Sequence, residues 1–267
     1  GPVFIHCMEG KDRTGFVCCL LEALAGASYD EMQTDYFDYY LMHSIGSGGL
    51  PAFNKRYVDN GIMDFVMGER EKGKIRQMGF SFHGNQDEFD QLIALHDKYH
   101  WDFVQIQMNY VDWRHATGNN TNAEYLYEKL DNLGLPITVM EPLQGGRLAN
   151  VPQNIAQEFK QRDPDASIAS WAFRFVGSFP NILCCLSGMT YMDNLIDNVN
   201  TFTDFVPMNE EELAFMEKMA VMMMEYPTVN CNDCKYCMPC PYGINIPDIF
   251  KHYNTCVNEG LIAQSAS

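Results

Sequence analysis

Residues 72–83, KGKIRQMGFSFH, decide the fold class of this chain. Within them, Ile75–Phe80 is typical of a short β-strand, and Gln86–Lys98, which follows, has the amphipathic spacing of a helix. A strand that leads directly into a helix is the repeating unit of a parallel α/β sheet. The same alternation continues on both sides of this stretch, so we expect an α/β fold.

Other runs extend the pattern, and most of the strand candidates are continuously apolar, as in strands that helices cover on both faces. The further predicted strands are Val3–His6, Phe37–Met42, Phe103–Met108, Ile137–Met140 and Ile182–Leu186. The further predicted helices are Thr14–Ala25, Tyr57–Glu71, Asn122–Asn132 and a pair around Val151–Val176. No dinucleotide glycine fingerprint links a strand to a helix, and we interpret Gly46-x-Gly48-Gly49 as a flexible loop. We therefore predict an incomplete (β/α)8-type barrel of about six parallel units rather than a doubly wound sheet.

Charge and hydropathy exclude several classes of partner. The 267 residues include 18 Lys+Arg and 35 Asp+Glu, which gives a net charge of −17. Nucleic acids and anionic membrane surfaces are bound by clustered basic side chains, so we expect neither as a partner. We also expect no membrane span and no signal segment, because no apolar run of about 18 residues is present and no charged-then-apolar stretch opens the chain.

The pattern changes after residue 205. Met208–Tyr226 predicts a Glu- and Met-rich helix with Asn209 as its cap. The helical spacing of Met216, Met219 and Met223 indicates core packing rather than function. A last helix is predicted near Asp248–Cys256.

Four of the ten cysteines form one cluster, Cys231-x2-Cys234-x2-Cys237-x2-Cys240-Pro241. A zinc site usually takes two CxxC pairs separated by a longer loop, whereas successive x2 spacings with a Cys-Pro suit a [4Fe–4S] cluster. We predict the cluster, with Cys240 as the fourth ligand and Cys256 as its alternative, and a reducing, cytoplasmic location. The spacing leaves two roles open for the cluster. It either transfers electrons to a partner protein or holds parts of the fold together. Four further cysteines, at 18, 19, 184 and 185, are interpreted as core residues.

The N-terminal residues 6–15, HCMEGKDRTG, place a Cys-x5-Arg-Thr loop between a predicted strand and a helix. Loop amides and Arg13 can hold an oxyanion, and the same positive field lowers the pKa of a cysteine thiol. The loop resembles the signature of protein tyrosine phosphatases, including a bacterial type that acts on phosphoinositides. The resemblance covers about residues 1–31 and implies Cys7 as nucleophile, Arg13 as phosphate clamp, Thr14 as activator of the thioenzyme intermediate and Asp12 as general acid. Anion binding without turnover is the alternative.

From about Met32 onward the chain resembles the aldo/keto reductase family, in particular a subgroup with a C-terminal iron–sulfur segment. The stretches that carry the resemblance are residues 35–43, 72–83, 104–109, 140–146 and 187–198. The family folds as a (β/α)8 barrel and transfers hydride between NAD(P)H and a carbonyl, with its chemistry at the carboxyl ends of the strands.

The resemblance implies a role for each matching residue. His43 matches the histidine that orients the carbonyl, Ser81 and Gln105 match contacts to the nicotinamide carboxamide, and Met140 stands where many members stack an aromatic ring. Four further residues match contacts to the adenosine-phosphate end of the cofactor: Gly188, Asn194, Asp197 and Asn198. The family's catalytic Asp, Tyr acid and Lys have no counterpart, so we expect impaired turnover of a small carbonyl substrate.

These resemblances together predict a fusion. Residues 1–31 form a phosphatase-like strand, loop and helix, residues 32–205 a partial reductase barrel without its first units, and residues 206–267 a helix and cluster-binding segment. If Val3–His6 pairs beside Phe37–Met42, the anion loop opens at the same barrel mouth as His43. Six strands cannot close such a barrel, so exposed sheet edges favour a homo-oligomer.

Overall fold

The computed structural model describes residues 37–189, 191–229, 231, 235 and 237–261. They form an α/β fold with five parallel strands, which confirms the predicted fold class in its coarse form. The described residues divide into two compact units, one holding 37–82 and 87–103 and the other holding 83–86 and those from 104 onward. The predicted elements Val3–His6 and Thr14–Ala25 lie outside the described residues, as does the pairing of Val3–His6 with the strand that begins at Phe37.

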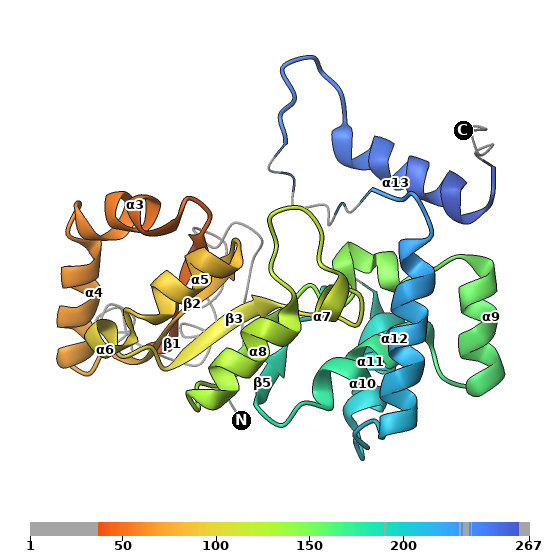
Figure 1. The fold of residues 1–267 in the computed structure, drawn as a ribbon, viewed down its shortest axis with the longest axis horizontal. Coiled ribbons are helices and arrows are strands. Elements are labelled where there is room, and N and C mark those ends of the chain that lie inside the picture. The colour runs from red at the N-terminus through yellow and green to blue at the C-terminus, as the bar shows by residue number, and fades with distance from the viewer. Residues whose placement is uncertain (1–36, 190, 230, 232–234, 236, 262–267) are drawn as a thin grey trace, which may run out of the picture. The chain divides into compact units, whose positions relative to one another are not determined.

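The first unit contains two neighbouring strands and the helices that follow them (Figure 1). Its elements are β1 (Phe37–Gly46), α3 (Gly49–Phe53), the π-helix η1 (Asn54–Val58), α4 (Ile62–Glu71), β2 (Ile75–His83), α5 (Gln86–Ile93) and α6 (His96–Tyr99). Both strands run several residues beyond their predicted ends. Phe80 and Phe89 are fully buried in its core, where apolar burial supplies most of the stability.

One glycine of the first unit is required by close packing. A Cβ at Gly79, in the middle of β2, would lie 2.3 Å from the backbone oxygen of Phe103. Real Cβ atoms do not approach a carbonyl oxygen that closely, so this position admits glycine only, unless the backbone shifts. The middle of β2 therefore lies directly against Phe103.

The glycine-rich run, which the sequence analysis interpreted as a flexible loop, includes the last residue of β1, a turn and the first residue of α3. Gly46, Gly48 and Gly49 have φ values of 133°, 85° and 59°, a range that favours glycine. Gly48 caps α3, and its backbone N–H donates to Glu88 Oε1 at 2.9 Å. The run therefore turns the chain sharply from β1 into a helix.

The second unit contains three parallel strands in the order β3, β4, β5. Its elements are β3 (Phe103–Gln107), α7 (Asp112–His115), α8 (Ala123–Asn132), β4 (Ile137–Met140), the 3₁₀ helix η2 (Gln144–Ala149), α9 (Gln153–Arg162), α10 (Ile168–Gly177), β5 (Ile182–Cys185), α11 (Met192–Phe202), α12 (Glu210–Met224) and α13 (Ile246–Asn258). The strand predictions are confirmed to within one residue at each end. The sequence analysis did not predict α7, η2 or α11.

The residues of β3 and β4 divide into an apolar and a polar face because side chains alternate along a strand. Val104 and Ile106 pair in register with Ile137 and Val139, and all four are completely buried. On the other face, Gln105 pairs with Thr138, and Gln107 with Met140. A packed strand pair that carries polar side chains on one face is typical of a sheet that positions a site.

The long helix α12 is built as the sequence predicts. Asn209 Oδ1 accepts the Glu212 N–H at 2.9 Å, and Glu212 Oε2 accepts the Asn209 N–H at 3.1 Å, which is a capping box. Met216, Met219 and Met223 are completely buried, as expected of core residues. Across the described residues, each helix is too short or too polar to cross a membrane.

Candidate active site

A pair of buried polar side chains lies on the polar face of the second unit. Gln105 on β3 is 2% exposed, and Thr138, its register partner on β4, is 0% exposed. Gln105 Nε2 and Thr138 Oγ1 find no hydrogen-bond partner among the described residues. An unsatisfied buried polar group costs about 1–3 kcal/mol, so two of them on neighbouring strands indicate a place where a polar ligand or water binds.

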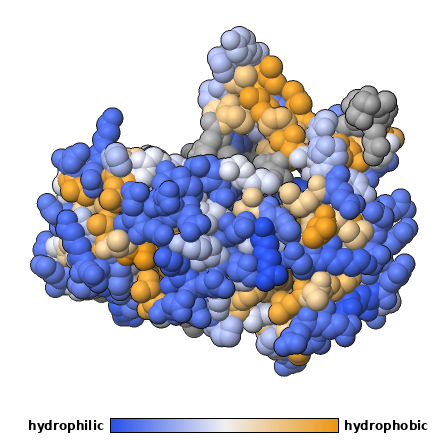
Figure 2. Space-filling view, viewed as in Figure 1, coloured by the Kyte–Doolittle hydropathy of each residue, from blue (hydrophilic) through white to orange (hydrophobic). Residues whose placement is uncertain are grey.

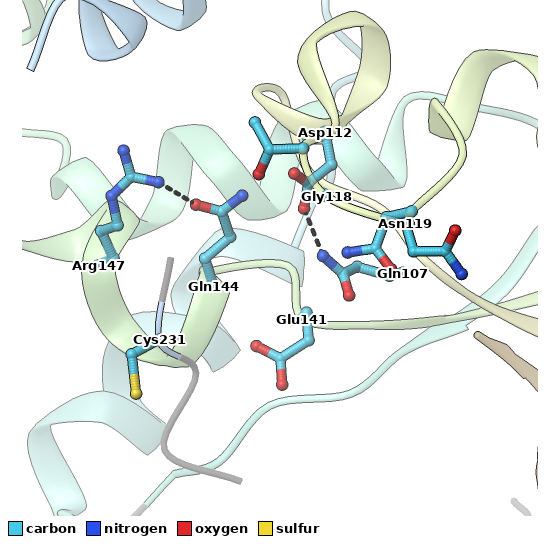
Figure 3. A pocket seen from close by; sticks show the side chains of 10 residues that line it. Gln107, Asp112, Gly118, Asn119, Glu141, Gln144, Arg147 and Cys231 are labelled. Carbon is cyan, nitrogen blue, oxygen red and sulfur yellow. Dashed lines mark hydrogen bonds between the residues drawn. The ribbon is translucent and has the colours of Figure 1, made fainter. Parts of the chain in front are cut away.

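A polar cavity of about 320 Å³ opens beyond Gln105 and Thr138, at the carboxyl ends of β3 and β4 (Figure 3). We call it the strand-end pocket. Its lining residues are Gln107, Asp112, Thr117, Gly118, Asn119, Asn120, Glu141, Gln144, Arg147 and Cys231. Parallel α/β folds place their ligands at this end of the strands, because the loops gather there.

Asn109 organises one wall of the strand-end pocket. It is completely buried, and its Oδ1 accepts the backbone N–H groups of Val111 and Asp112 at 3.0 and 2.8 Å. Its Nδ2 donates to Asp112 Oδ2 at 2.6 Å and to the backbone oxygen of Glu141 at 3.1 Å. Asp112 also accepts from Gln107 Nε2 at 2.7 Å. A single side chain thus ties the end of β3, the start of α7 and the end of β4 together.

The opposite wall follows β4 and has an unusual backbone. Glu141 and Gln144 have φ values of 59° and 45°, which are uncommon for residues other than glycine. Gln144 Oε1 accepts from Arg147 Nη1 at 2.7 Å. Burial lowers the pKa of the Arg147 guanidinium, an effect that nearby Tyr110 and Asp112 oppose. Strained backbone of this kind collects at functional sites.

The residues of the strand-end pocket other than Cys231 were missed by the sequence reasoning. Two signals could have indicated them: Asn109 and Asp112 come directly after an apolar strand, and Glu141 comes directly after the next one. Polar side chains at the carboxyl ends of consecutive parallel strands converge on one edge.

Two of the predicted reductase residues lie in the first unit. His43 is an exposed residue of β1, and its backbone oxygen accepts from the Tyr57 hydroxyl at 2.7 Å. Ser81 on β2 is 2% exposed, and its Oγ accepts the backbone N–H of Ser44 at 2.7 Å. Since Ser44 has a φ of 51°, Ser81 supports an irregular end of β1 whatever else it binds.

The predicted adenosine-phosphate residues lie after β5 and on α11. Gly188 is exposed, and Asn194 Oδ1 accepts the Tyr191 N–H at 3.3 Å at the start of the helix. Asp197 accepts from the Ser167 hydroxyl at 2.6 Å, and Asn198 donates to Ser187 Oγ at 2.8 Å. All three α11 residues therefore have hydrogen bonds that support the fold.

Comparison with known proteins decides the family. The aldo/keto reductase family model matches residues 21–221. The chain belongs to the aldo/keto reductase family. The match begins inside residues 1–31, the stretch that the sequence analysis assigned to a phosphatase-like fragment.

Solved aldo-keto reductases share the fold. A thermostable aldo-keto reductase in complex with the inhibitor epalrestat has a TM-score of 0.53 and 19% identity, covering 75% of this chain and 65% of that one. The aldo-keto reductase of Bacillus halodurans in its holo form has a TM-score of 0.53 and 16% identity, covering 74% and 64%. The chain thus spans about two thirds of the length of these structures. No match was found among curated proteins.

The cysteine cluster of this aldo/keto reductase is only partly described. Cys231 is half-buried and lines the strand-end pocket, Cys237 is exposed, and Cys240 and Cys256 are half-buried. Cys234 lies outside the described residues. Cys256 Sγ is 3.8 Å from His252 Nε2. Among the described side chains, no group of three or more His, Cys, Asp or Glu is arranged to hold a metal ion. The [4Fe–4S] site therefore stays a prediction from spacing.

Cys184 and Cys185, which the sequence analysis assigned to the core, lie half-buried on β5. Burial raises the pKa of both thiols, and the neighbouring Cys184 adds to the effect at Cys185. Both thiols therefore stay protonated near neutral pH, as structural cysteines do. The predicted phosphatase residues Cys7, Asp12, Arg13 and Thr14 lie outside the described residues, so their roles stay predictions.

Proposed function

We propose that this member of the aldo/keto reductase family binds NAD(P)H and reduces a small carbonyl compound. The observation that carries the proposal is the pair of buried, unsatisfied side chains Gln105 and Thr138. A carboxamide has one donor group and one acceptor, so it satisfies an amide and a hydroxyl side by side.

The residues present fit a nicotinamide at this place. Gln105 and Thr138 would hold the carboxamide. Half-buried Met140 lies two residues after Thr138, on the same face of β4. Met140 offers an apolar, polarizable contact to a ring. When bound, the dihydronicotinamide supplies the hydride. By resemblance, His43 orients the carbonyl and Ser81 adds a carboxamide contact, whereas Gly188, Asn194, Asp197 and Asn198 face the adenosine-phosphate end.

We also propose that Cys231, Cys234, Cys237 and Cys240 hold a [4Fe–4S] cluster, with Cys256 as the alternative fourth ligand. The regular x2 spacing followed by Pro241 supports the cluster, and the position of Cys231 at the strand-end pocket supports an electron-transfer role over a structural clip. A redox protein partner and a reducing, cytoplasmic compartment follow from this role.

Cofactor titration tests the carbonyl-reduction proposal. We expect NADPH or NADH to quench the intrinsic fluorescence of the anaerobically purified chain with micromolar affinity, and Gln105→Leu to weaken binding at least tenfold. Because Gln105 Nε2 is buried and has no hydrogen-bond partner among the described residues, Gln105→Leu should not lower the melting temperature. Gln161→Leu, at an exposed position of α9, is the matched control.

Two results would contradict these proposals separately. Absence of binding of either nicotinamide cofactor to the wild-type chain would remove the reductase function. If the purified protein is colourless and contains zinc but no iron or acid-labile sulfide, the cluster proposal is wrong. That result would not affect the proposal of cofactor binding.

A further inference from the structure

Helix α11 presents a row of exposed apolar side chains along its whole length. Five large apolar residues of the helix and the tyrosine at its cap are 40–74% exposed, and we call them the α11 stripe: Tyr191, Met192, Leu195, Ile196, Val199 and Phe202. Residues three and four apart are neighbours on a helix surface, so these side chains form one patch. Single exposed apolar residues are normal, whereas a contiguous apolar patch larger than a few hundred Å² marks an interaction site.

The contacts of α11 with its own unit involve polar residues. Asn198, the buried residue of the helix, donates to Ser187 Oγ at 2.8 Å, and Asp197 accepts from the Ser167 hydroxyl at 2.6 Å. The helix lies beside α10 (Figure 1). An amphipathic surface helix normally does the reverse, burying its apolar face and exposing its polar one. The exposed apolar face of α11 therefore fits a further surface outside this unit.

The spacing of the stripe fits a second helix. Four of its residues follow one another at intervals of three, four and three positions: Met192, Leu195, Val199 and Phe202. This is the spacing of the a and d positions by which two helices pack side by side. The charged residues of α11, Asp193 and Asp197, lie outside this series. A helix can therefore pack along the stripe without meeting a carboxylate in the seam.

A second copy of the chain supplies a helix of the required kind. Around a two-fold axis both copies use the same patch, so an uncharged apolar series is complementary to itself. Large apolar side chains that are about half exposed present on the order of 100 Å² each, so the stripe offers roughly 600 Å² per copy. Two copies would bury about 1,200 Å², which is the lower limit for a specific interface. The area therefore suffices for a weak dimer.

Charge favours a second copy over a basic partner. A basic protein would be recognised by acidic side chains, and the six residues of the stripe carry no charge. Two copies with a net charge of −17 each repel one another over long distances, and salt screens this repulsion without weakening the apolar contact. Association of two copies should therefore strengthen with salt, whereas attraction to a basic partner would weaken.

We propose that the α11 stripe is the interface of a homodimer, in which α11 of one copy packs antiparallel against α11 of a second copy. The sequence analysis expected association at exposed sheet edges, and the exposed apolar residues favour this helix instead. The inference depends on neither the nicotinamide cofactor nor the cysteine cluster.

Sedimentation velocity of the anaerobically purified full chain measures the association, with a thiol reductant present to exclude disulfide-linked dimers. We expect a monomer–dimer equilibrium with a Kd of about 10 μM in about 500 mM NaCl. In about 50 mM NaCl the dimer should be at least tenfold weaker, because the repulsion between the two acidic copies is less screened.

Two matched valine variants locate the interface. Val199 in the stripe is 53% exposed, and Val221 on α12 is 47% exposed. Val199→Glu adds a carboxylate to each side of the seam and should weaken the dimer at least tenfold, whereas Val221→Glu should change its Kd less than twofold. Because both positions are exposed, the melting temperature of the monomer should be the same in the two variants.

Three results would overturn the inference. They are a dimer that Val199→Glu does not weaken, a dimer that dissociates as salt is raised, and a wild-type chain that stays monomeric up to about 500 μM in about 500 mM NaCl. The last result would assign the α11 stripe to a partner other than a second copy.

Discussion

At the scale of single residues, buried polar groups without partners mark two different situations. Gln105 and Thr138 lie at the carboxyl half of their strands, where a ligand can satisfy them. Tyr110 is 1% exposed, and its ring lies against Phe159 and Phe175 at centroid distances of 6.4 and 6.5 Å. Its hydroxyl has no hydrogen-bond partner among the described residues, and burial raises its pKa well above 10. Because this hydroxyl lies among aromatic rings, we expect it to lower the stability of the fold.

Replacing Tyr110 by Phe should therefore stabilise the protein. At pH 7 we expect a free energy of unfolding about 1 kcal/mol higher, because an unsatisfied buried hydroxyl is removed. The wild-type phenol stays neutral in the folded chain because burial raises its pKa, and it ionises near pH 10 in the unfolded chain. Ionisation therefore favours the unfolded chain and lowers the free energy of unfolding as pH rises above 10. Urea denaturation between pH 7 and 10.5 should show a shallower alkaline decline in Tyr110→Phe.

Tyr127 provides the comparison for Tyr110. It is 9% exposed, burial raises its pKa, and a backbone hydrogen bond from Asn181 opposes that rise. Tyr127→Phe loses this bond and should lower the free energy of unfolding by about 1 kcal/mol. A destabilised Tyr110→Phe would show that its hydroxyl has a partner after all.

At the scale of elements, α11 differs from α10 because most of its large apolar residues are exposed. The only buried residue of α11 is Asn198, whereas α10 buries six of its residues, including Trp171 and Phe173. The exposed large apolar residues of α11 are Met192, Leu195, Ile196, Val199 and Phe202. Their helical spacing forms an apolar stripe that normally faces a core. On another face of the helix, Asp197 accepts from the Ser167 hydroxyl and Asn198 donates to Ser187 Oγ.

The start of helix α12 depends on a local hydrogen bond between its cap, Asn209, and Glu212. Asn209→Ala removes the acceptor for the Glu212 N–H and should lower the free energy of unfolding by about 1 kcal/mol, measured by urea denaturation. Asn209→Asp keeps an acceptor oxygen and should retain most of that stability, although three glutamates follow it in the first turn. Equal losses in the two variants would mean that the cap does not act through this bond.

At the scale of the whole molecule, the net charge of −17 dominates the surface. Figure 2 shows a visible face on which hydrophilic residues predominate, with smaller apolar areas between them. Like charges at this density repel one another in the compact state more than in the expanded unfolded chain. The acidity therefore favours a dissolved chain and at the same time lowers its folding stability.

Salt should consequently raise the thermal stability. Between about 10 and 500 mM NaCl the screening length falls from about 30 Å to a few ångströms, which weakens this repulsion. We expect the melting temperature to rise by several degrees over that range, measured by circular dichroism at pH 7. KCl should act equally, since the effect is one of ionic strength. A melting temperature that falls with salt would indicate that attractive ion pairs outweigh the repulsion.

Local pattern predicted much of the fold because its causes are local. Apolar runs set the strands within one to four residues, and β4 was predicted without error at Ile137–Met140. The capping residue Asn209 and the buried methionines of α12 follow from side-chain type and helical spacing alone. The family resemblance was likewise readable, since its stretches follow one another in chain order. Helix α11 was missed, although its apolar residues have helical spacing.

The sequence by itself determined the parallel strand–helix alternation, the acidic surface and the cysteine spacing, each of which depends on neighbours in the chain. Only the tertiary structure decided which polar residues meet. Asn109, Asp112 and Glu141 are separated by up to 32 residues and become one network because β3 and β4 pair in a particular register. Gln105 and Thr138 become unsatisfied for the same reason. Register depends on how the whole sheet packs, and that free energy belongs to no single stretch of sequence.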